Sequence, residues 1–370
     1  MTPPPLPRPT PPPRPTADKA ASIGRALPFL VLLVAVVADL ATTDAHRLDR
    51  LLFAVPALAA VAWGPVATAG TGLIATAATL ALYVGRSGFE NLGFPYSTVV
   101  ALLLLTLVSA GSSALRERRE RQLRQVGAIA DTTQRAVQRP LPSRLGGTDL
   151  HLLYEASARG ARVGGDFHQA VPVPGGVRLM VGDVQGKGLG AVEASALLLG
   201  SFRESAYTAD DLPEVARRLD ATMRRHGELC PDSEAAERFA TVLLVEIPDD
   251  GAVARVLSCG HPAPLVQHDG QVTTVPLPDP ALPVNLPGLA NDEFDVVEIP
   301  FAPADRLLLF TDGVSETRDA AGDFYPLEDR ARSWAAHPAD EVLPLLGDDL
   351  TRHASGALTD DTTAVLAVRR

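Results

Sequence analysis

Asp183 stands where an apolar stretch of the sequence gives way to glycine. Residues 177–181 predict a buried strand, and Gly186 and Gly188 follow Asp183 within five residues. An aspartate at a strand end followed by glycines is a common way to present a metal ligand. Glycine lets the backbone turn tightly and come close to an ion or a phosphate. An ordinary glycine-rich turn is the alternative, and this stretch alone does not decide between the two.

Four further aspartates occupy comparable places between residues 146 and 370. Asp166 follows two glycines, Asp312 follows a predicted strand at residues 306–310, and Asp360 and Asp361 directly precede the last predicted strand. Mg²⁺ and Mn²⁺ prefer such carboxylate oxygens, whereas the eight scattered histidines and two cysteines show no zinc spacing. Each aspartate alone is typical of a surface turn. Their joint placement at strand ends predicts a site for Mg²⁺ or Mn²⁺.

The elements that must position these aspartates form blocks of strands and helices. The predicted strands cover residues 150–158, 177–182, 240–247, 252–258, 264–267, 271–275, 296–299, 306–310 and 362–368. The predicted helices cover residues 190–207, 212–226 and parts of 327–353. Two helices among antiparallel strands and two late ones are typical of an α+β domain with helix-covered sheets. They do not fit a Rossmann-type parallel sheet.

The first third of the chain predicts a membrane domain. Residues 27–111 are overwhelmingly apolar, in runs at 27–40, 51–84 and 96–110, and the middle run is interrupted at 63–65. Because a membrane helix needs about 20 residues, the middle run is long enough for two helices. We therefore expect four spans. Three spans are the alternative, if the middle run is one span plus a re-entrant piece.

Charge sets the expected orientation and the partners. Four basic residues precede the first apolar run and five follow the last one, whereas the loops between the runs are balanced. The positive-inside rule therefore predicts a multi-pass protein of the cell membrane with both termini and the second half cytoplasmic. Residues 1–145 carry 15 basic and 8 acidic side chains, and residues 146–370 carry 18 and 36. This acidity argues against nucleic acid as a partner.

The expected domain boundaries follow from these shifts in composition. They are a disordered proline-rich tail at 1–22, transmembrane helices at 23–111, a linker helix at 112–144 and the α+β domain at 145–370. The linker carries a heptad-like seam of about two repeats, which predicts a homodimeric coiled coil, with a monomeric amphipathic helix as the alternative. The seam residues are Leu123, Val126, Ala130, Thr133 and Val137.

Six motifs between residues 146 and 370 occur in the order known from one protein family. They are Gly164-Gly165-Asp166-Phe167, Gly182-Asp183-Val184-Gln185-Gly186-Lys187-Gly188, Phe239-Ala240-Thr241, Gly260-His261-Pro262, Thr311-Asp312-Gly313-Val314-Ser315-Glu316 and Asp360-Asp361-Thr362-Thr363. Residues 146–370 thereby resemble the metal-dependent serine/threonine phosphatases of the type-2C superfamily. The resemblance is closest to the bacterial branch typified by the stage II sporulation E phosphatase and the sigma-factor regulator phosphatases. It implies a four-layer α-β-β-α sandwich with two Mn²⁺ or Mg²⁺ ions at one end.

The resemblance also implies a role for each acidic residue. Asp183 matches the aspartate that bridges both ions, and the backbone carbonyl of Val184 would ligate the first ion. Asp312 and Asp360 match ligands of the second ion. Asp361 is adjacent, and the sequence leaves open whether it exchanges roles with Asp360. The implied chemistry is attack on phosphorus by a water activated between the two ions.

Other positions near the motifs have less definite roles. Asp166 matches the acidic residue that supports the first ion, directly or through water. His168 and Gln185 depart from the residues frequent in relatives and are interpreted as modifiers of access or pKa. Lys187 is either a contact for the phosphoprotein or a solvated loop lysine. His261 is either a proton donor or a residue that orients a turn.

The resemblance implies a substrate class as well. In this branch the substrate is typically a phosphoserine or phosphothreonine regulatory protein, such as an anti-sigma-factor antagonist, and a switch lies in the helix after Asp183, here residues 190–207. Two other functions stay open on the sequence. One is a phosphoprotein docking module at the membrane that does not hydrolyse, and the other is a hydrolase of small phosphorylated molecules.

Overall fold

The computed structural model describes residues 17–41, 49–87, 96–155, 164–286, 294–356, 358 and 360–370. It divides into two compact units, Met1–Leu123 and Arg124–Arg370. The predicted proline-rich tail lies mostly outside the described residues, as do most of the loops expected between the apolar runs.

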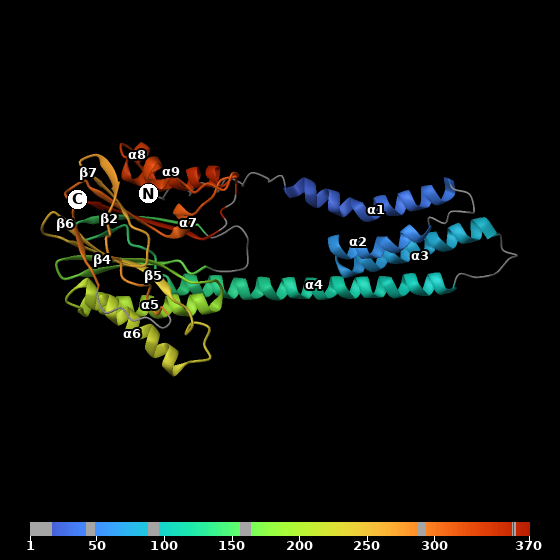
Figure 1. The fold of residues 1–370 in the computed structure, drawn as a ribbon, viewed down its shortest axis with the longest axis horizontal. Coiled ribbons are helices and arrows are strands. Elements are labelled where there is room, and N and C mark those ends of the chain that lie inside the picture. Colours follow the sequence, from blue (N-terminus) through green and yellow to red (C-terminus); the bar gives the residue numbers. More distant parts are fainter. Residues whose placement is uncertain are drawn as a thin grey trace, which may run out of the picture. The chain divides into compact units, whose positions relative to one another are not determined.

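Apart from Trp63 and Gly64, the described residues of the first unit are helical. Its elements are α1 (Ala17–Ala41), the 3-10 helix η1 (Asp49–Phe53), α2 (Ala54–Ala62), α3 (Pro65–Ser87) and α4 (Tyr96–Val137) (Figure 1). The predicted interruption of the middle apolar run is confirmed, because α2 ends before Trp63 and α3 begins at Pro65. Proline is well suited to a first helical position, since it has the required φ and its missing N–H needs no partner there.

Two helical segments of this unit are long and apolar enough to cross a membrane by length and composition. They are Pro65–Gly85 and Tyr96–Gln122, and 33% and 22% of their most apolar windows are buried. Two further apolar helices, Ala26–Ala41 and Arg50–Ala62, are shorter. The four apolar segments follow the predicted order, and crossing by all four stays a prediction.

The linker predicted at 112–144 does not begin a new helix, because α4 continues without interruption for 42 residues to Val137. The side chains of Leu123, Val126 and Ala130 lie outside what the structure describes, so the dimer seam stays a prediction. Within the second unit, Val137 packs against the apolar cluster that contains Leu198, Phe202 and Leu219.

Two antiparallel sheets form the centre of the second unit. The strands are β1 (Arg144–Leu145), β2 (Thr148–Glu155), β3 (Phe167–Val173), β4 (Gly176–Val184), β5 (Ala240–Pro248), β6 (Val253–Cys259), β7 (Leu265–His268), β8 (Gln271–Thr274), β9 (Val297–Pro300), β10 (Arg306–Phe310) and β11 (Thr362–Arg369). One sheet has the order β1-β2-β11-β10-β7-β8 and the other β3-β4-β5-β6-β9. Every pairing between these named strands is antiparallel, which confirms the α+β prediction over a Rossmann-type sheet.

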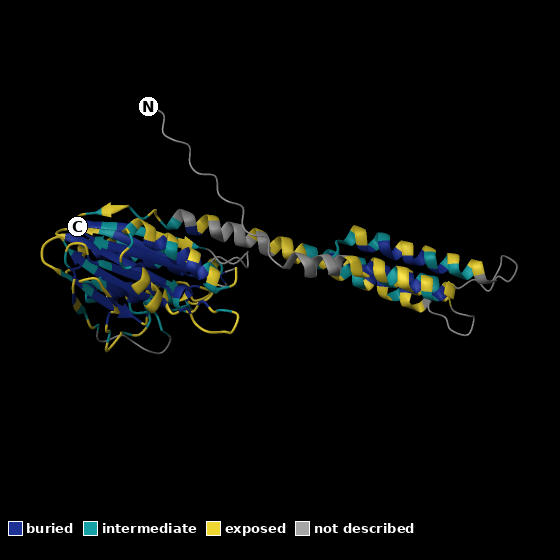
Figure 2. Ribbon diagram, turned by 90° about the horizontal axis from the view of Figure 1, so that it is seen from above, coloured by how far each residue is buried: buried dark blue, intermediate teal, exposed yellow. Residues whose placement is uncertain are grey.

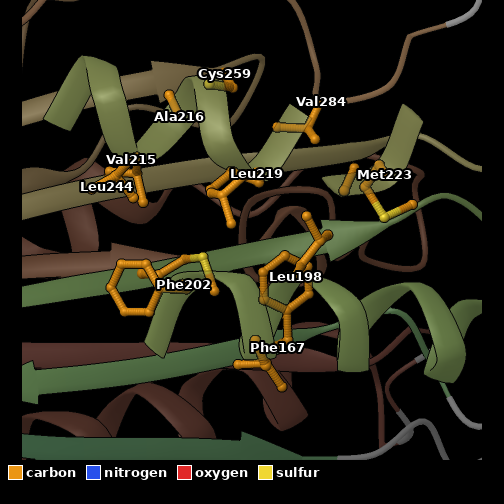
Figure 3. Packing of buried hydrophobic residues seen from close by; sticks show 14 of the residues in the cluster. Phe167, Leu198, Phe202, Val215, Ala216, Leu219, Met223, Leu244, Cys259 and Val284 are labelled. Carbon is orange, nitrogen blue, oxygen red and sulfur yellow. The ribbon is translucent and has the colours of Figure 1, made fainter. Parts of the chain in front are cut away.

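Helices cover the outer face of each sheet and complete the four predicted layers (Figure 1). The helices are α5 (Leu189–Thr208), α6 (Leu212–Leu229), the single turn α7 (Asp312–Ser315), α8 (Leu327–Trp334) and α9 (Ala339–His353). The apolar residues of α5 and α6 share one buried cluster with β4 and β5, and those of α8 and α9 share another with β10 and β11. Figure 3 shows the first of these clusters.

The alternation of side chains along β10 shows how one strand serves two layers. Leu307 and Leu309 lie in the cluster between the sheets, and Leu308 and Phe310 lie in the cluster beneath α8 and α9. Successive side chains of a strand point to opposite faces, so a strand buried on both faces is a continuous apolar run. In Figure 2 the buried residues accordingly concentrate in the sheets.

The sequence missed β3. Its residues His168 and Gln169 are polar but buried, and Pro172 interrupts the pattern expected of a strand. Asp166 therefore precedes a strand rather than ending one.

Candidate active site

Asp166 and Asp183 come together because β3 and β4 form an antiparallel pair. Asp166 directly precedes β3, and Asp183 is the penultimate residue of β4. Gly165 sits against the same turn, where the Val184 N–H donates to its carbonyl at 3.2 Å. A Cβ on Gly165 would collide with the Val184 carbonyl oxygen. Only glycine fits here, because the backbone of Val184 approaches it closely. The close approach brings the Asp166 and Asp183 side chains near the Val184 carbonyl.

The second sheet brings the other aspartates to the same end of the sandwich. Asp312 lies two residues beyond β10, Asp360 and Asp361 lie directly before β11, and these strands pair antiparallel. A Cβ on Gly313 would collide with the Asp361 carbonyl oxygen. The glycine therefore lets the turn after β10 rest against the turn before β11.

Thr311 joins the two halves of the site. Its hydroxyl donates to Asp166 Oδ2 at 2.7 Å, and its backbone N–H donates to the Thr363 carbonyl at 3.0 Å. The Thr363 N–H donates in turn to the Thr311 hydroxyl oxygen at 3.1 Å. Asp166 directly precedes a strand of one sheet and Thr363 lies in a strand of the other, so this network ties the Asp166 carboxylate to the opposite sheet.

His261 makes a second connection between the sheets. Its Nε2 lies 2.9 Å from the Phe310 carbonyl, and its Nδ1 lies 3.0 Å from the Thr241 hydroxyl. Because the carbonyl can only accept, Nε2 carries the proton and Nδ1 accepts from threonine. Burial lowers the pKa of His261 to about 4. A neutral histidine with both nitrogens occupied orients its turn, as the second sequence interpretation held, and is not placed to donate a proton.

Burial and mutual repulsion raise the pKa values of the central carboxyl groups. The pKa of Asp183 rises to about 7, mainly through burial and then through the charges of Asp312, Asp360 and Asp361. The pKa of Asp166 is held well above its usual range by burial and by the charge of Asp183. Burial also raises that of Asp312, with Asp360 among the repelling charges. The five predicted aspartates therefore lie close enough to repel one another, and a cation between them would offset that repulsion.

Asp360 and Asp361 are neighbours with different surroundings. Asp361 is buried and lies against Gly164, where a Cβ would collide with its carboxylate. Asp360 is exposed, and its Oδ1 lies 2.5 Å from Lys187 Nζ. Asp360 and Asp312 line a cavity of about 300 Å³, whereas Asp361 does not. Of the two, Asp360 is the carboxylate that faces this cavity.

Comparison with known proteins identifies the domain. A family model described as Stage II sporulation protein E (SpoIIE) matches residues 173–370. This chain belongs to the SpoIIE family. It therefore carries a serine/threonine phosphatase domain of the type-2C fold.

Solved structures support the assignment of the SpoIIE domain. The RsbU and RsbW domains of a Mycobacterium tuberculosis protein are 25% identical, with a TM-score of 0.52 over 64% of this chain and 63% of that one. The SiaA-PP2C domain of Pseudomonas aeruginosa is 18% identical, with a TM-score of 0.53 over 70% and 99%. The PP2C phosphatase domain of SpoIIE from Bacillus subtilis, with a fragment of its regulatory domain, is 18% identical, with a TM-score of 0.50 over 60% of this chain and 63% of that one. The last two show the fold alone.

A curated relative matches over a smaller share of its length. Protein IcfG of Synechocystis sp. is 21% identical over 236 residues, which are 56% of this chain and 36% of IcfG. This chain thus spans about a third of that relative.

Arg238 supports the turn that follows Asp183, and no pattern in the sequence indicates this role. Its guanidinium donates to the carbonyls of Gln185 at 2.5 Å and Lys187 at 3.5 Å. Gly186, with a φ of 87°, lies so close to the guanidinium that a Cβ would collide with it. The arginine therefore holds the turn that follows Asp183.

The end of α4 also reaches the segment that carries Asp166. Gln134 Nε2 donates to the Asp166 carbonyl at 3.1 Å, and Gln138 Nε2 lies 3.0 Å from His168 Nδ1. Arg203 of α5 donates to the Val137 carbonyl at 2.7 Å. These polar residues also escaped sequence reasoning, because their partners lie about 30 or more positions away in the chain.

The oxygen donors of the SpoIIE domain suit hard divalent ions, although their side chains do not converge on one point. Among the described residues, no three His, Cys, Asp or Glu side chains form a complete ligand group. Lys187 is paired with Asp360. Carboxylate and carbonyl oxygens around a glycine-lined turn are ligands that suit Mg²⁺ and Mn²⁺.

Proposed function

We propose that this chain is a membrane-anchored phosphatase that uses two Mn²⁺ or Mg²⁺ ions to dephosphorylate phosphoserine or phosphothreonine on a cytoplasmic regulatory protein. The observation that carries the proposal is the electrostatic contact of Asp183 with Asp312, Asp360 and Asp361 at one end of a SpoIIE-family domain. Repelling carboxylates are retained at a stability cost. Such a cost is expected where function requires the charge.

The metal ligands that we propose are all oxygen donors. They are Asp183, the Val184 carbonyl, Asp312 and Asp360, with Asp166 and Asp361 in support. Bound ions would supply the positive charge that acidifies water and neutralises the phosphoryl oxygens. The protein contributes position: Thr311 fixes Asp166, and the glycines let the turns approach. The cavity beside Asp312 and Asp360 gives a phosphorylated side chain access from solvent.

Membrane anchoring is supported by where the apolar residues of the first unit lie. Most of the apolar windows in α3 and α4 are unburied, which differs from the core helix of a soluble protein. Large apolar side chains such as Leu73, Leu104 and Leu107 are more than half exposed, and exposed residues follow these helices in Figure 2. Lipid is the environment that would cover them, and the distribution of basic residues favours a cytoplasmic catalytic domain.

The substrate that we propose is a phosphorylated regulator such as an anti-sigma-factor antagonist. The similar Mycobacterium tuberculosis chain contains RsbU and RsbW domains, and the family resemblance implies this substrate class. The open cavity suits a phosphorylated residue presented by a protein. In the same proposal, α4 passes signals to the site through Gln134, Gln138 and Arg203, and two copies of the chain associate through α4.

The test is phosphate release by the full-length chain in detergent micelles, with and without Mn²⁺. The substrates are p-nitrophenyl phosphate and a phosphoserine-containing anti-sigma-factor antagonist. We expect turnover that needs Mn²⁺, is lost in Asp312→Asn and is retained in the exposed control Asp279→Asn. Binding of the phosphoprotein without turnover would instead make the chain a docking module. Turnover of small phosphates alone would make it a small-molecule hydrolase.

A further inference from the structure

Lys187 is unusual in this chain because of its type. The sequence holds 33 basic residues, of which only Lys19 and Lys187 are lysines. Residues 146–370 carry 17 arginines and this single lysine. Lys187, in the turn that follows Asp183, is therefore the only lysine ammonium that the sequence holds between residues 146 and 370.

The Lys187 ammonium lies where a cation is needed. Its Nζ is 2.5 Å from Asp360 Oδ1, and Asp312 lines the same cavity as Asp360. These two carboxylates line the cavity and are proposed ligands of one ion. The ammonium thus supplies part of the positive charge that the ion would supply beside these carboxylates.

The backbone on both sides of Lys187 is part of a supported turn. Gly186 and Gly188 both have positive φ, and Arg238 holds the carbonyls of Gln185 and Lys187 from the other side. The ion pair itself is part-exposed, with 32% of the lysine side chain and 56% of the Asp360 side chain accessible. Such pairs are weak enough for a divalent ion to displace.

We propose that Lys187 is an exchangeable counter-ion that holds Asp360 in the metal-free protein and is displaced by the incoming metal. Lys187 is a positioning residue in this scheme. It keeps a ligand carboxylate in place and raises the metal concentration at which the site fills. The inference rests on the proposed metal-dependent function.

The first experiment measures the rate at which acetic anhydride labels Lys187 in the full-length chain, read by mass spectrometry, with and without Mn²⁺. Lys19 is the internal reference for loss of reagent. We expect Mn²⁺ to accelerate labelling of Lys187 several-fold relative to Lys19, because the ion pair no longer holds the amine. In Asp360→Asn, labelling should already be fast without Mn²⁺. This readout requires neither catalysis nor, for the wild type, a substitution.

The second experiment uses calorimetry to compare the Mn²⁺ affinities of the wild type and of substituted proteins. Lys187→Met should bind Mn²⁺ up to about fivefold more tightly than the wild type, since an exposed pair is worth about 1 kcal/mol or less. Lys187→Arg should bind it more weakly, because a guanidinium grips a carboxylate with two donors. Arg318→Met is the matched control, because Arg318 lines the same cavity but bonds Gly322 and stacks on Phe324. Its affinity should stay within about twofold of the wild type on the same grounds.

The outcomes separate this inference from the proposed function. If Mn²⁺ binds and labelling of Lys187 does not change, the counter-ion role is wrong and the phosphatase proposal stands. Weaker Mn²⁺ binding by both lysine variants would likewise overturn it, since that pattern indicates damage to the turn. Absence of any Mn²⁺ binding by the wild type would overturn both.

Discussion

Replacing Asp183 by asparagine should stabilise the metal-free protein while abolishing its activity. The pKa of Asp183 rises from 3.8 to about 7 through burial and three neighbouring carboxylates. One pKa unit corresponds to about 1.36 kcal/mol, so ionising this group costs about 4 kcal/mol more in the folded than in the unfolded protein. Asparagine has nearly the same shape and no charge. We expect Asp183→Asn to increase the free energy of unfolding by about 2–4 kcal/mol at pH 8 without metal, on that scale.

The sign depends on pH in a defined way. Below pH 3.8 the group is protonated in both states, and the substitution should change little. Between pH 3.8 and about 7 the unfolded chain gives up the proton while the folded protein keeps it, so the wild type loses stability as pH rises. Above pH 7 the whole cost is present. The difference between Asp183→Asn and the wild type should therefore grow from pH 4 to 7 and then level off.

The assay is urea unfolding of the full-length chain in detergent and EDTA, followed by tryptophan fluorescence. The chain has two tryptophans, and Trp63→Phe leaves buried Trp334 as the reporter of the catalytic unit. Exposed Asp279→Asn is the matched control and should change nothing. Saturating Mn²⁺ should reverse the order, since it stabilises only the variant that binds it. Destabilisation by Asp183→Asn in EDTA at pH 8, or a difference independent of pH, would refute the electrostatic account of the site.

Three further outcomes follow from the same geometry. Gly165→Ala should lower the free energy of unfolding by about 1–3 kcal/mol and remove Mn²⁺-dependent activity, because its Cβ collides with the Val184 carbonyl; urea unfolding and phosphate release measure both. His261→Phe leaves the Phe310 carbonyl without its donor, so we expect a loss of about 1–3 kcal/mol in the same unfolding assay. Burial lowers the pKa values of His168 and His261 to about 4, so stability should fall as pH drops from 6.5 towards 4; urea midpoints in an Asp183→Asn background would show it.

Strand positions and acidic motif residues were predictable because both depend on short stretches of sequence. Apolar runs bounded by glycine and aspartate marked β4, β10 and β11 to within two residues, and every predicted aspartate lies at the same end of the sandwich. What failed was β3, where His168 and Gln169 are buried through hydrogen bonds that no local pattern shows. A polar residue in a core strand is recognisable only when its partner is known.

The supporting residues of the site could not be predicted for the same reason. Thr311 bonds Asp166 across 145 positions, and His261 reaches Phe310 across 49. Arg238 lies in a stretch that looks like an ordinary loop, yet it holds the carbonyl of Gln185. Sequence spacing identifies which residues carry the chemistry. Their orientation depends on contacts that exist only after the two sheets pack.

The hydrogen bonds of Thr311 and His261 connect the two sheets at the site. The packing of the sheets and the arrangement of the site residues therefore depend on each other. Asp166 and Asp183 come from one sheet, while Asp312 and Asp360 come from the other. The carboxylates repel one another, so they oppose closure of the sandwich at this end. Thr311 and His261 form hydrogen bonds that connect the two sheets at this end and oppose that repulsion. A cation beside the aspartates, whether Lys187 or a bound metal, weakens the repulsion that is left. The number of cations bound there should therefore determine how stable the contact between the two sheets is at this end of the domain.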